Sequence, residues 1–299
     1  MNQRLTPATA LLLTIAALLW AGNAVVGRLV TGLVPPITLN FLRWALAFLL
    51  LLPLAGWVLR PGSGLWSHSR RFMLLGLLGV GCYNALQYLA LTTSTALNVT
   101  LVASSTPVWM LLIGAVGFGQ RVTLRQVAGA VLSIAGVLVV LARGDWAELL
   151  EVRLVPGDLY VLLATLGWAV YSWLLVQPGD PPRIRADWAA FLMAQVVFGL
   201  AWSGLFAGAE WALTDAKIVW GWPLAAALLF VAVGPAILAY RCWGLGVQRA
   251  GPNVAGFFGN LTPLFAALMS AAFLREMPHL YHAVAFILIV GGIVVSSRR

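Results

Sequence analysis

Long apolar runs separated by short polar breaks form the main pattern along this chain. A helix needs about 20 predominantly apolar residues to cross the hydrocarbon core of a bilayer. Runs of this length recur between charged residues and Pro or Gly breaks, so the pattern predicts ten transmembrane helices with short connections. Their expected positions are residues 7–30, 35–59, 71–92, 95–117, 124–142, 157–177, 187–208, 219–245, 251–273 and 279–296.

The composition agrees with lipid as the main solvent and partner of this chain. Of its 299 residues, 62% are hydrophobic and 9% are charged, against about 45–50% and about 25% in an ordinary soluble domain. The basic residues are scattered singly or in pairs, which argues against a nucleic-acid partner. Both cysteines, Cys82 and Cys242, fall inside apolar runs, so we expect buried thiols and no disulfide framework.

The charge of the connections predicts an orientation in the membrane. With ten spans, both termini share one side with the connections that follow helices 2, 4, 6 and 8. Eleven of the 18 basic residues lie on that side, and four lie on the other. The positive-inside rule therefore predicts a multi-pass protein of the cell's inner membrane with both termini cytoplasmic. The first apolar run resembles a cleavable signal peptide, but we expect it to be retained as the first helix.

The two halves of the chain resemble each other. Asn98-Val99 recurs as Asn253-Val254, and Trp20 has its counterpart in Trp168. These matches divide the chain into residues 1–150 and residues 151–299, with five helices each. An odd number of spans inverts the second unit relative to the first. The predicted fold is thus an all-α integral membrane protein of two inverted-topology repeats, an architecture suited to alternating access.

Several short motifs resemble the drug/metabolite transporter superfamily, in particular its EamA-type members. They are Leu19-Trp20-Ala21-Gly22-Asn23, Phe41-Leu42-Arg43, and Pro263 followed by Glu276 and Gly291-Gly292. The first half departs from the pattern, since Gln120 stands where the family shows a glutamate after Pro107. The resemblance covers nearly the whole chain and implies a transporter that exports amino acids or related metabolites.

The candidate substrate site lies near the bilayer midplane, where the repeats of such transporters meet. Trp20 and Trp168 occupy the middle of their predicted helices. Asn23 and Tyr171 follow three residues later, on the same helix face. Each half therefore offers an aromatic ring with a polar partner. The alternative reading is that these tryptophans only pack against other helices or lipid.

The predicted helix 71–92 is the most polar span. Its polar face points inward, because unpartnered amides in lipid are costly, and meets either other helices or a wet cavity. Further candidates are aromatic and amide side chains on two later spans. The full set of expected substrate contacts in these three spans is Tyr83, Asn84, Gln87, Tyr240, Trp243, Phe257 and Asn260.

Two arginines and two prolines are expected to have structural or gating roles. Arg43 and Arg241 are charges inside predicted spans, which makes each a functional candidate. Arg241 can also extend to the cytoplasmic surface, whereas Arg43 lies deeper and could meet a carboxylate or backbone carbonyls. Pro107 and Pro263 interrupt their helices, and the small polar residues near Pro107 are expected to relieve that kink.

The available side chains narrow the function. No Asp or Glu falls in the middle of a predicted span, which argues against efflux of cationic drugs and against tight proton coupling. Trp, Tyr, Asn and Gln suit a small net-neutral substrate, and aromatic or large neutral amino acids fit best. The alternatives are a nucleoside or sugar derivative and, more distantly, an intramembrane enzyme. Glu276, His279 and His282 stand at a helix start, so we expect no metal site, no cofactor and no catalytic residue.

Overall fold

The computed structural model describes residues 5–94, 96–142, 146–150, 153, 155–274 and 279–297, and every regular element within them is helical. The helices before residue 143 are α1 (Pro7–Leu29), α2 (Pro36–Ala55), η1 (Gly56–Leu59), η2 (Trp66–His68), α3 (Ser69–Leu75), η3 (Gly76–Cys82), α4 (Tyr83–Ala90), α5 (Ala96–Ala103), α6 (Thr106–Phe118) and α7 (Leu124–Ala142). Those that follow are α8 (Ala147–Leu150), α9 (Pro156–Leu174), α10 (Pro182–Ala186), α11 (Trp188–Leu213), α12 (Trp222–Val231), η4 (Ala232–Leu238), α13 (Ala239–Ala250), α14 (Pro252–Phe258), α15 (Leu261–Leu274) and α16 (Leu280–Ser297).

Helix starts follow local rules. Proline occupies the first turn of α1, α2, α9 and α12, among others, where its missing N–H is not needed. The Thr6 hydroxyl caps α1 by accepting from the Thr9 N–H, at 3.2 Å. The Asp187 carboxylate does the same for α11 by accepting from the Ala189 N–H, at 2.9 Å. The breaks between apolar runs thus became helix boundaries because their residues cap or initiate helices.

The prediction of an all-helical membrane protein is confirmed. Eight helical segments in the described part of the chain are long and apolar enough to cross a membrane. The predicted span 157–177 coincides with α9, which carries Asp158 in its first turn. The predicted span 251–273 coincides with α14 and α15, which a turn at residues 259–260 separates. Neither of these two is among the eight, so the count of ten spans stays a prediction.

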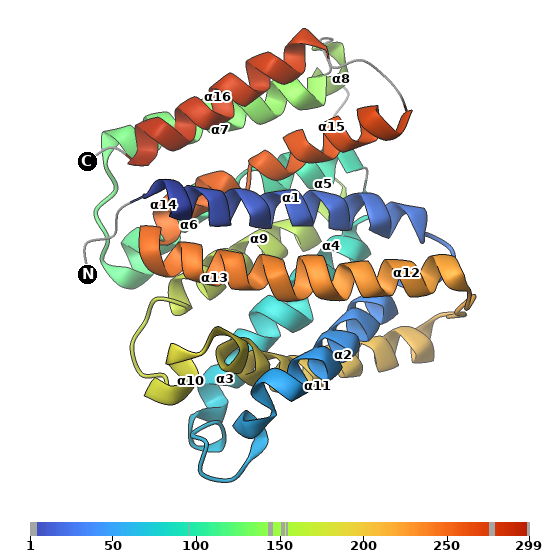
Figure 1. Cartoon of the computed structure of the whole chain (residues 1–299). Helices are drawn as coiled ribbons and strands as arrows, with labels where there is room; N and C mark the ends of the chain where they lie inside the picture. Colours follow the sequence, from blue (N-terminus) through green and yellow to red (C-terminus); the bar gives the residue numbers. More distant parts are fainter. Residues whose placement is uncertain are drawn as a thin grey trace.

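The helices form one bundle in which α1, α9 and the α12–η4–α13 run occupy the middle (Figure 1). There α1 packs against α13 and α15, while α9 packs against α4, α5, α6 and η3. On one flank α11 packs along α2 and η3. On the opposite flank α7 and α16 lie side by side (Figure 1). The middle helices therefore bury side chains on several faces and form the core.

Small residues bring α7 and α16 close together. A Cβ atom on Gly129 would lie 2.7 Å from the Gly292 carbonyl oxygen. A Cβ atom on Gly292 would lie 2.6 Å from the Gly129 carbonyl oxygen. Both positions therefore require glycine, because any larger residue would force the two backbones apart. Close backbone approach at small residues is how membrane helices gain packing energy in the absence of a hydrophobic driving force.

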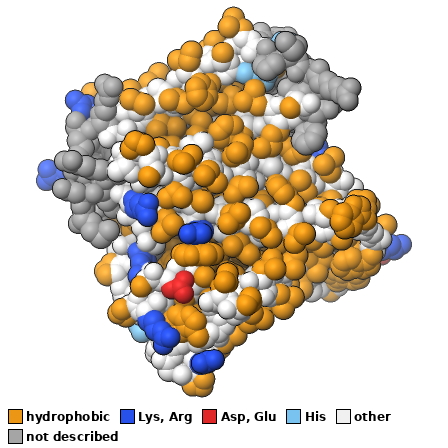
Figure 2. Space-filling view, viewed as in Figure 1, with side chains coloured by type: hydrophobic (Ala, Val, Ile, Leu, Met, Phe, Trp, Pro, Cys, Tyr) orange, Lys and Arg blue, Asp and Glu red, His pale blue; other side chains and the backbone are white. Residues whose placement is uncertain are grey.

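The two ends of the described chain lie on the same side of the bundle. The start of α1, the end of α16 and the α6–α7 and α9–α10 connections all lie at the left of Figure 1. Figure 2 shows most of the visible Lys and Arg side chains gathered toward that side, with hydrophobic side chains across the middle. On this side the buried Asp180 carboxylate binds both Arg71 and Arg185. Arg71 also donates from Nη2 to the Leu174 carbonyl oxygen, at 3.0 Å, so it ties α3 to the end of α9.

Two π-helices of seven residues each interrupt long α-helical segments, at equivalent positions in the two halves of the chain. η3 (Gly76–Cys82) and η4 (Ala232–Leu238) lie 156 residues apart at both their starts and their ends. A π-helix departs from the α pattern of backbone hydrogen bonds and is frequent at functional sites. In both segments carbonyl oxygens accept hydrogen bonds from side chains of other helices. These are Gly79 from the Tyr240 hydroxyl, Val80 from Asn40 Nδ2 at 3.1 Å, and Pro235 from Trp20 Nε1 at 3.3 Å.

Candidate functional site

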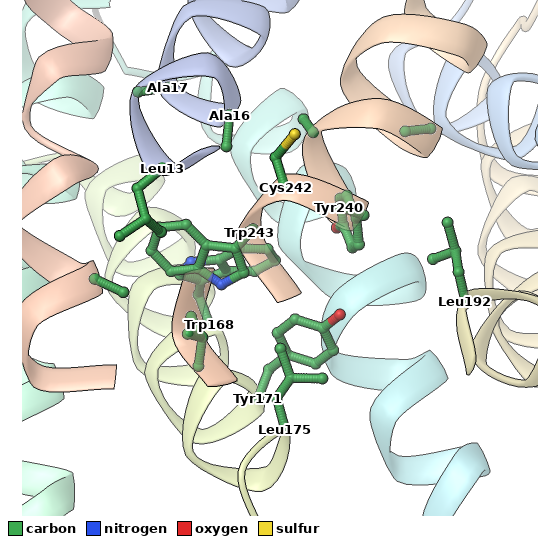
Figure 3. Packing of buried hydrophobic residues seen from close by; sticks show 14 of the residues in the cluster. Leu13, Ala16, Ala17, Trp168, Tyr171, Leu175, Leu192, Tyr240, Cys242 and Trp243 are labelled. Atoms are coloured by element: carbon green, nitrogen blue, oxygen red, sulfur yellow. The ribbon is translucent and has the colours of Figure 1, made fainter. Parts of the chain in front are cut away.

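Aromatic side chains from five helices meet in the middle of the bundle. We call this group the aromatic cluster; it consists of Trp20 from α1, Trp44 from α2, Tyr83 from α4, Trp168 and Tyr171 from α9, and Tyr240 and Trp243 from α13. Figure 3 shows the indoles of Trp168 and Trp243 lying together, with the phenol rings of Tyr171 and Tyr240 beside them. The sequence places these rings far apart, and the packing of α1 and α9 with α13 and α4 brings them together.

Trp168 is the centre of the cluster. Its side chain is 2% exposed, and its ring pairs with five others that come from α1, α4, α9 and α13. Edge-to-face and tilted geometries dominate, which are the arrangements that aromatic quadrupoles favour. The distances between ring centroids are 5.3 Å to Trp20, 4.5 Å to Tyr83, 4.9 Å to Tyr171, 5.6 Å to Tyr240 and 5.5 Å to Trp243.

Four members of the cluster have hydrogen-bond partners, namely Trp20, Tyr171, Tyr240 and Trp243. Besides the bonds to η3 and η4, Trp243 Nε1 donates to Ser172 Oγ at 3.2 Å. The Tyr171 hydroxyl donates to Oε1 of Gln195 in α11, at 2.8 Å. Buried polar groups need such partners, because leaving them unpaired costs free energy. Each bond also sets the direction of a ring, so the cluster has a defined geometry.

A polar network adjoins the cluster. Arg43 is fully buried in α2 and donates from Nη1 to Asn23 Oδ1, at 3.2 Å. Asn23 Nδ2 in turn lies 3.2 Å from the Tyr88 hydroxyl. The Arg43 guanidinium carbon lies 5.1 Å from the centroid of the Trp44 ring, and that ring is 4.9 Å from Tyr240. Positive charge and amide groups therefore lie directly beside the aromatic rings.

Most of the predicted site residues come together. Trp20, Tyr83, Trp168, Tyr171, Tyr240 and Trp243 belong to the aromatic cluster, and Asn23 lies next to it in the polar network. On α4, Asn84 is buried and Gln87 is half-buried. The polar face of this helix makes at least one helix–helix hydrogen bond, between Tyr88 and Asn23.

Phe257 and Asn260 are not joined to the aromatic cluster by a ring pair or a hydrogen bond in the described structure. Asn260 Nδ2 donates to Ser133 Oγ in α7, at 2.9 Å, so it fastens the turn between α14 and α15 to the α7 flank. Phe257 is fully buried at the end of α14, and its ring is not paired with a ring of the aromatic cluster in the described structure. Both residues stay candidate substrate contacts, but neither belongs to the aromatic cluster.

The four residues expected to have structural or gating roles also differ in setting. Arg241 is exposed, and its guanidinium carbon lies 4.4 Å from the Trp188 ring centroid at the start of α11. Pro107 is buried in the first turn of α6, directly after the turn that separates α5 from α6. Pro263 lies in the first turn of α15, after the corresponding turn. Arg43, by contrast, is in the interior beside the cluster.

Two members of this region escaped the sequence analysis. Trp44 belongs to the cluster. In the sequence it directly follows Arg43, and only the charged Arg43 stands out there as a functional candidate. Gln195 supports Tyr171 from α11. The sequence does indicate an internal role for Gln195, because it is the sole amide in a long apolar run and a lone amide in lipid needs an internal partner.

The two histidines near the last helix contact each other. His282 Nδ1 accepts from the His279 N–H at 3.1 Å, and the two rings are stacked. Glu276, the third residue considered, lies outside the described residues. Among the residues that the structure describes, no three His, Cys, Asp or Glu side chains gather in one place.

An all-helical membrane bundle with aromatic and polar side chains converging at its centre is an organisation that a multi-pass membrane transporter can use. The chain belongs to the EamA-like transporter family, whose model matches it twice, at residues 7–142 and 155–298. The resemblance seen in the sequence is thereby confirmed. Membership of this family indicates a transporter of the drug/metabolite type.

Individual relatives are distant in sequence, and two of them match nearly the whole chain. An uncharacterized transporter of Archaeoglobus fulgidus is 26% identical over 97% of this chain and 98% of its own length. The aromatic amino acid exporter YddG of Ancylobacter novellus is 26% identical and is covered over 94% of both chains. A crystal structure with 24% sequence identity superposes with a TM-score of 0.75, over 96% of this chain and 95% of that chain, which shows the shared fold.

Proposed function

We propose that this protein exports aromatic or large neutral amino acids across the inner membrane by alternating access, with the aromatic cluster as the centre of its substrate site. The observation that carries the proposal is the position of Trp168, whose ring meets five others from four helices. A substrate ring that stacks on these rings makes contacts worth about 0.5–1.5 kcal/mol per pair beyond burial, less the ring contacts that it displaces. The similarity to an aromatic amino acid exporter supports the same substrate class.

The composition of the site also suits a zwitterion. The cluster supplies flat apolar surfaces, and the polar network of Arg43, Asn23 and Tyr88 lies beside it. An aromatic amino acid has both features within one small molecule. A buried carboxylate that would attract a cationic drug is not among the described side chains at the cluster, where the ionisable groups are Arg43 and the tyrosines.

The origin of the rings supports the proposal of alternating access. Trp20, Trp44 and Tyr83 belong to the first predicted repeat, residues 1–150, and the other rings belong to the second, residues 151–299. Relative motion of two inverted repeats would open the cluster first to one side and then to the other. With both termini on the basic side, the positive-inside rule orients that side toward the cytoplasm.

A counterflow assay in proteoliposomes tests the proposed substrate class. The panel comprises L-phenylalanine, L-tryptophan, L-leucine, L-alanine and uridine, each labelled and each measured against an excess of itself. Counterflow of the aromatic and large neutral amino acids, with little of alanine, supports the proposal. Strong counterflow of uridine alone would assign the site to the alternative class, nucleosides, whose flat bases also stack on aromatic rings.

A further inference from the structure

Arg43 is a buried cation with an incomplete set of partners. Its side chain has 0% exposure and lies in the interior of α2 (Pro36–Ala55). Nη1 donates to Asn23 Oδ1, whereas Nε and Nη2 have no hydrogen-bond partner in the described structure. An arginine keeps its charge in proteins and presents five N–H donors in a planar fork. Two of the three nitrogens of this fork are therefore unused.

Three buried acidic side chains of the described structure are engaged elsewhere. Asp180 binds Arg71 and Arg185 on the side of the termini. Glu210 belongs to α11 and lies near the N-terminal end of α2, where its Oε2 accepts from the Thr38 N–H at 2.7 Å. Five residues separate Thr38 from Arg43, a rise of about 7.5 Å along the helix. Asp158 accepts from Asn98 Nδ2 at 3.0 Å, at the start of α9.

Two further unpaired polar atoms lie on the same face of α2 as Arg43. Asn40 Oδ1 and Trp44 Nε1 are buried and lack a partner in the part of the chain that the structure describes. Positions 40, 43 and 44 are related by three and four residues, so they share a helix face. The Trp44 ring on this face is paired with Tyr240 of the aromatic cluster. The unused donors of Arg43 and Trp44 thus adjoin the proposed substrate site.

An unpaired buried charge is strongly unfavourable, and an arginine fork matches the two oxygens of a carboxylate. We propose that Arg43 binds the carboxylate of the transported amino acid, assisted by Trp44 Nε1, while the substrate's side chain occupies the aromatic cluster. This inference rests on the proposed function and adds to it a requirement for an anionic carboxylate. Asn23 holds the third nitrogen of the fork and lies one helical turn after Trp20, so the anchor and the ring site are adjacent.

The experiment compares each amino acid with its amide, which lacks the anionic carboxylate. The pairs are L-phenylalanine with L-phenylalaninamide and L-leucine with L-leucinamide, measured as competitors in counterflow and as stabilisers in thermal unfolding in detergent. The wild-type protein should prefer each acid by about tenfold or more, the effect of losing a hydrogen bond to a charged group. Arg43→Gln should reduce this preference to less than about threefold.

Two variants separate a binding role from a structural one. Arg43→Lys keeps the charge but loses the planar fork, so it should show an intermediate preference for the acid over the amide. It also tests the inference if Arg43→Gln does not fold. Arg249→Gln removes an exposed arginine from α13 and should keep the wild-type preference. Without substrate, Arg43→Gln should melt at or above the wild-type temperature, because it removes an unpaired buried charge.

The outcomes distinguish this inference from the function on which it rests. An unchanged acid-to-amide preference in folded Arg43→Gln or Arg43→Lys overturns the inference, even where aromatic substrates are preferred. A lower melting temperature with an unchanged preference assigns Arg43 a structural role and overturns it as well. An Arg43-dependent preference for leucine over leucinamide, without any preference for aromatic substrates, supports the carboxylate anchor and contradicts the aromatic substrate class.

Discussion

The indole of Trp20 stands nearly perpendicular to that of Trp168, at 87°, with the ring centroids 5.3 Å apart. The two residues belong to α1 and α9, which are the first helices of the two regions that the family model matches. Their contact therefore joins the two predicted repeats at equivalent positions. Any motion that separates the repeats at this point must break it, and a bound aromatic ring can take its place.

Truncating either tryptophan should change which substrates are transported. Trp20→Ala or Trp168→Ala removes ring contacts worth about 0.5–1.5 kcal/mol each, and 1.4 kcal/mol corresponds to about tenfold in affinity. We expect the ratio of phenylalanine to leucine transport to fall by about threefold to tenfold, measured at equal membrane expression. Trp222→Ala is the matched control, because that side chain is 81% exposed. A wild-type ratio in both variants would mean that these tryptophans are packing residues.

The space beside Tyr171 depends on a glycine. A Cβ atom on Gly79 in η3 would lie 2.7 Å from the Tyr171 ring, which would have to shift. Because that ring is held between Trp168 and Gln195, Gly79→Ala should reduce transport of aromatic substrates severalfold. Gly244→Ala in α13 is the control, since its Cβ would meet nothing within 4 Å. Equal transport rates for the two variants would contradict the expectation.

The ion pairs of Asp180 should contribute to stability. Its carboxylate is buried and binds two arginines that are themselves partly exposed. Asp180→Asn should lower the free energy of unfolding by about 1–3 kcal/mol, an amount between those of exposed and fully buried pairs. Thermal unfolding in detergent measures the effect, and Asp215→Asn, at an exposed position, should leave the melting temperature unchanged. A melting temperature equal to that of Asp215→Asn would show that the pairs add nothing.

The distribution of basic residues predicts the topology. A reporter that is active only in the cytoplasm should give signal when fused after Arg299, and one that is active only outside should not. A second fusion in the connection between α11 and α12, near residue 215, should give the opposite pattern. Signals of the same kind at both positions would contradict the predicted number of spans, and a reversed pair would contradict the orientation.

Transport should proceed without an imposed pH gradient. The buried acids Asp158 and Glu210 lie near helix ends and are hydrogen-bonded there, so neither is positioned to carry a proton through the centre. Uptake into proteoliposomes should follow the substrate gradient at equal pH inside and outside. Uptake that requires a proton gradient and stops on addition of an ionophore would reveal a coupling residue outside the aromatic cluster.

The apolar runs and the duplicated Trp20 and Trp168 predicted most of the bundle and the centre of the candidate site. Both signals are local, since run length reflects bilayer thickness and the repeat preserves chemistry at equivalent positions. The rotation of each helix was not predictable in the same way. Phe257 and Asn260 have the same character as the cluster residues, yet Asn260 bonds to α7. Only tertiary packing decides which face of α14 or α2 points to the centre.

The two π-helices have a mechanical consequence. A π-helical turn holds more residues than an α-helical turn, so each segment contains more residues than an α-helix with the same number of turns. Each residue of an α-helix advances the chain by about 100° around the axis. Converting a π-helical turn into an α-helical turn would shift the chain by one residue and would therefore rotate the following helix by about this angle. Tyr83 follows η3 directly, and Tyr240 comes two residues after η4. Rewinding either segment would thus swing a tyrosine of the cluster away from Trp168 without bending the rest of the helix.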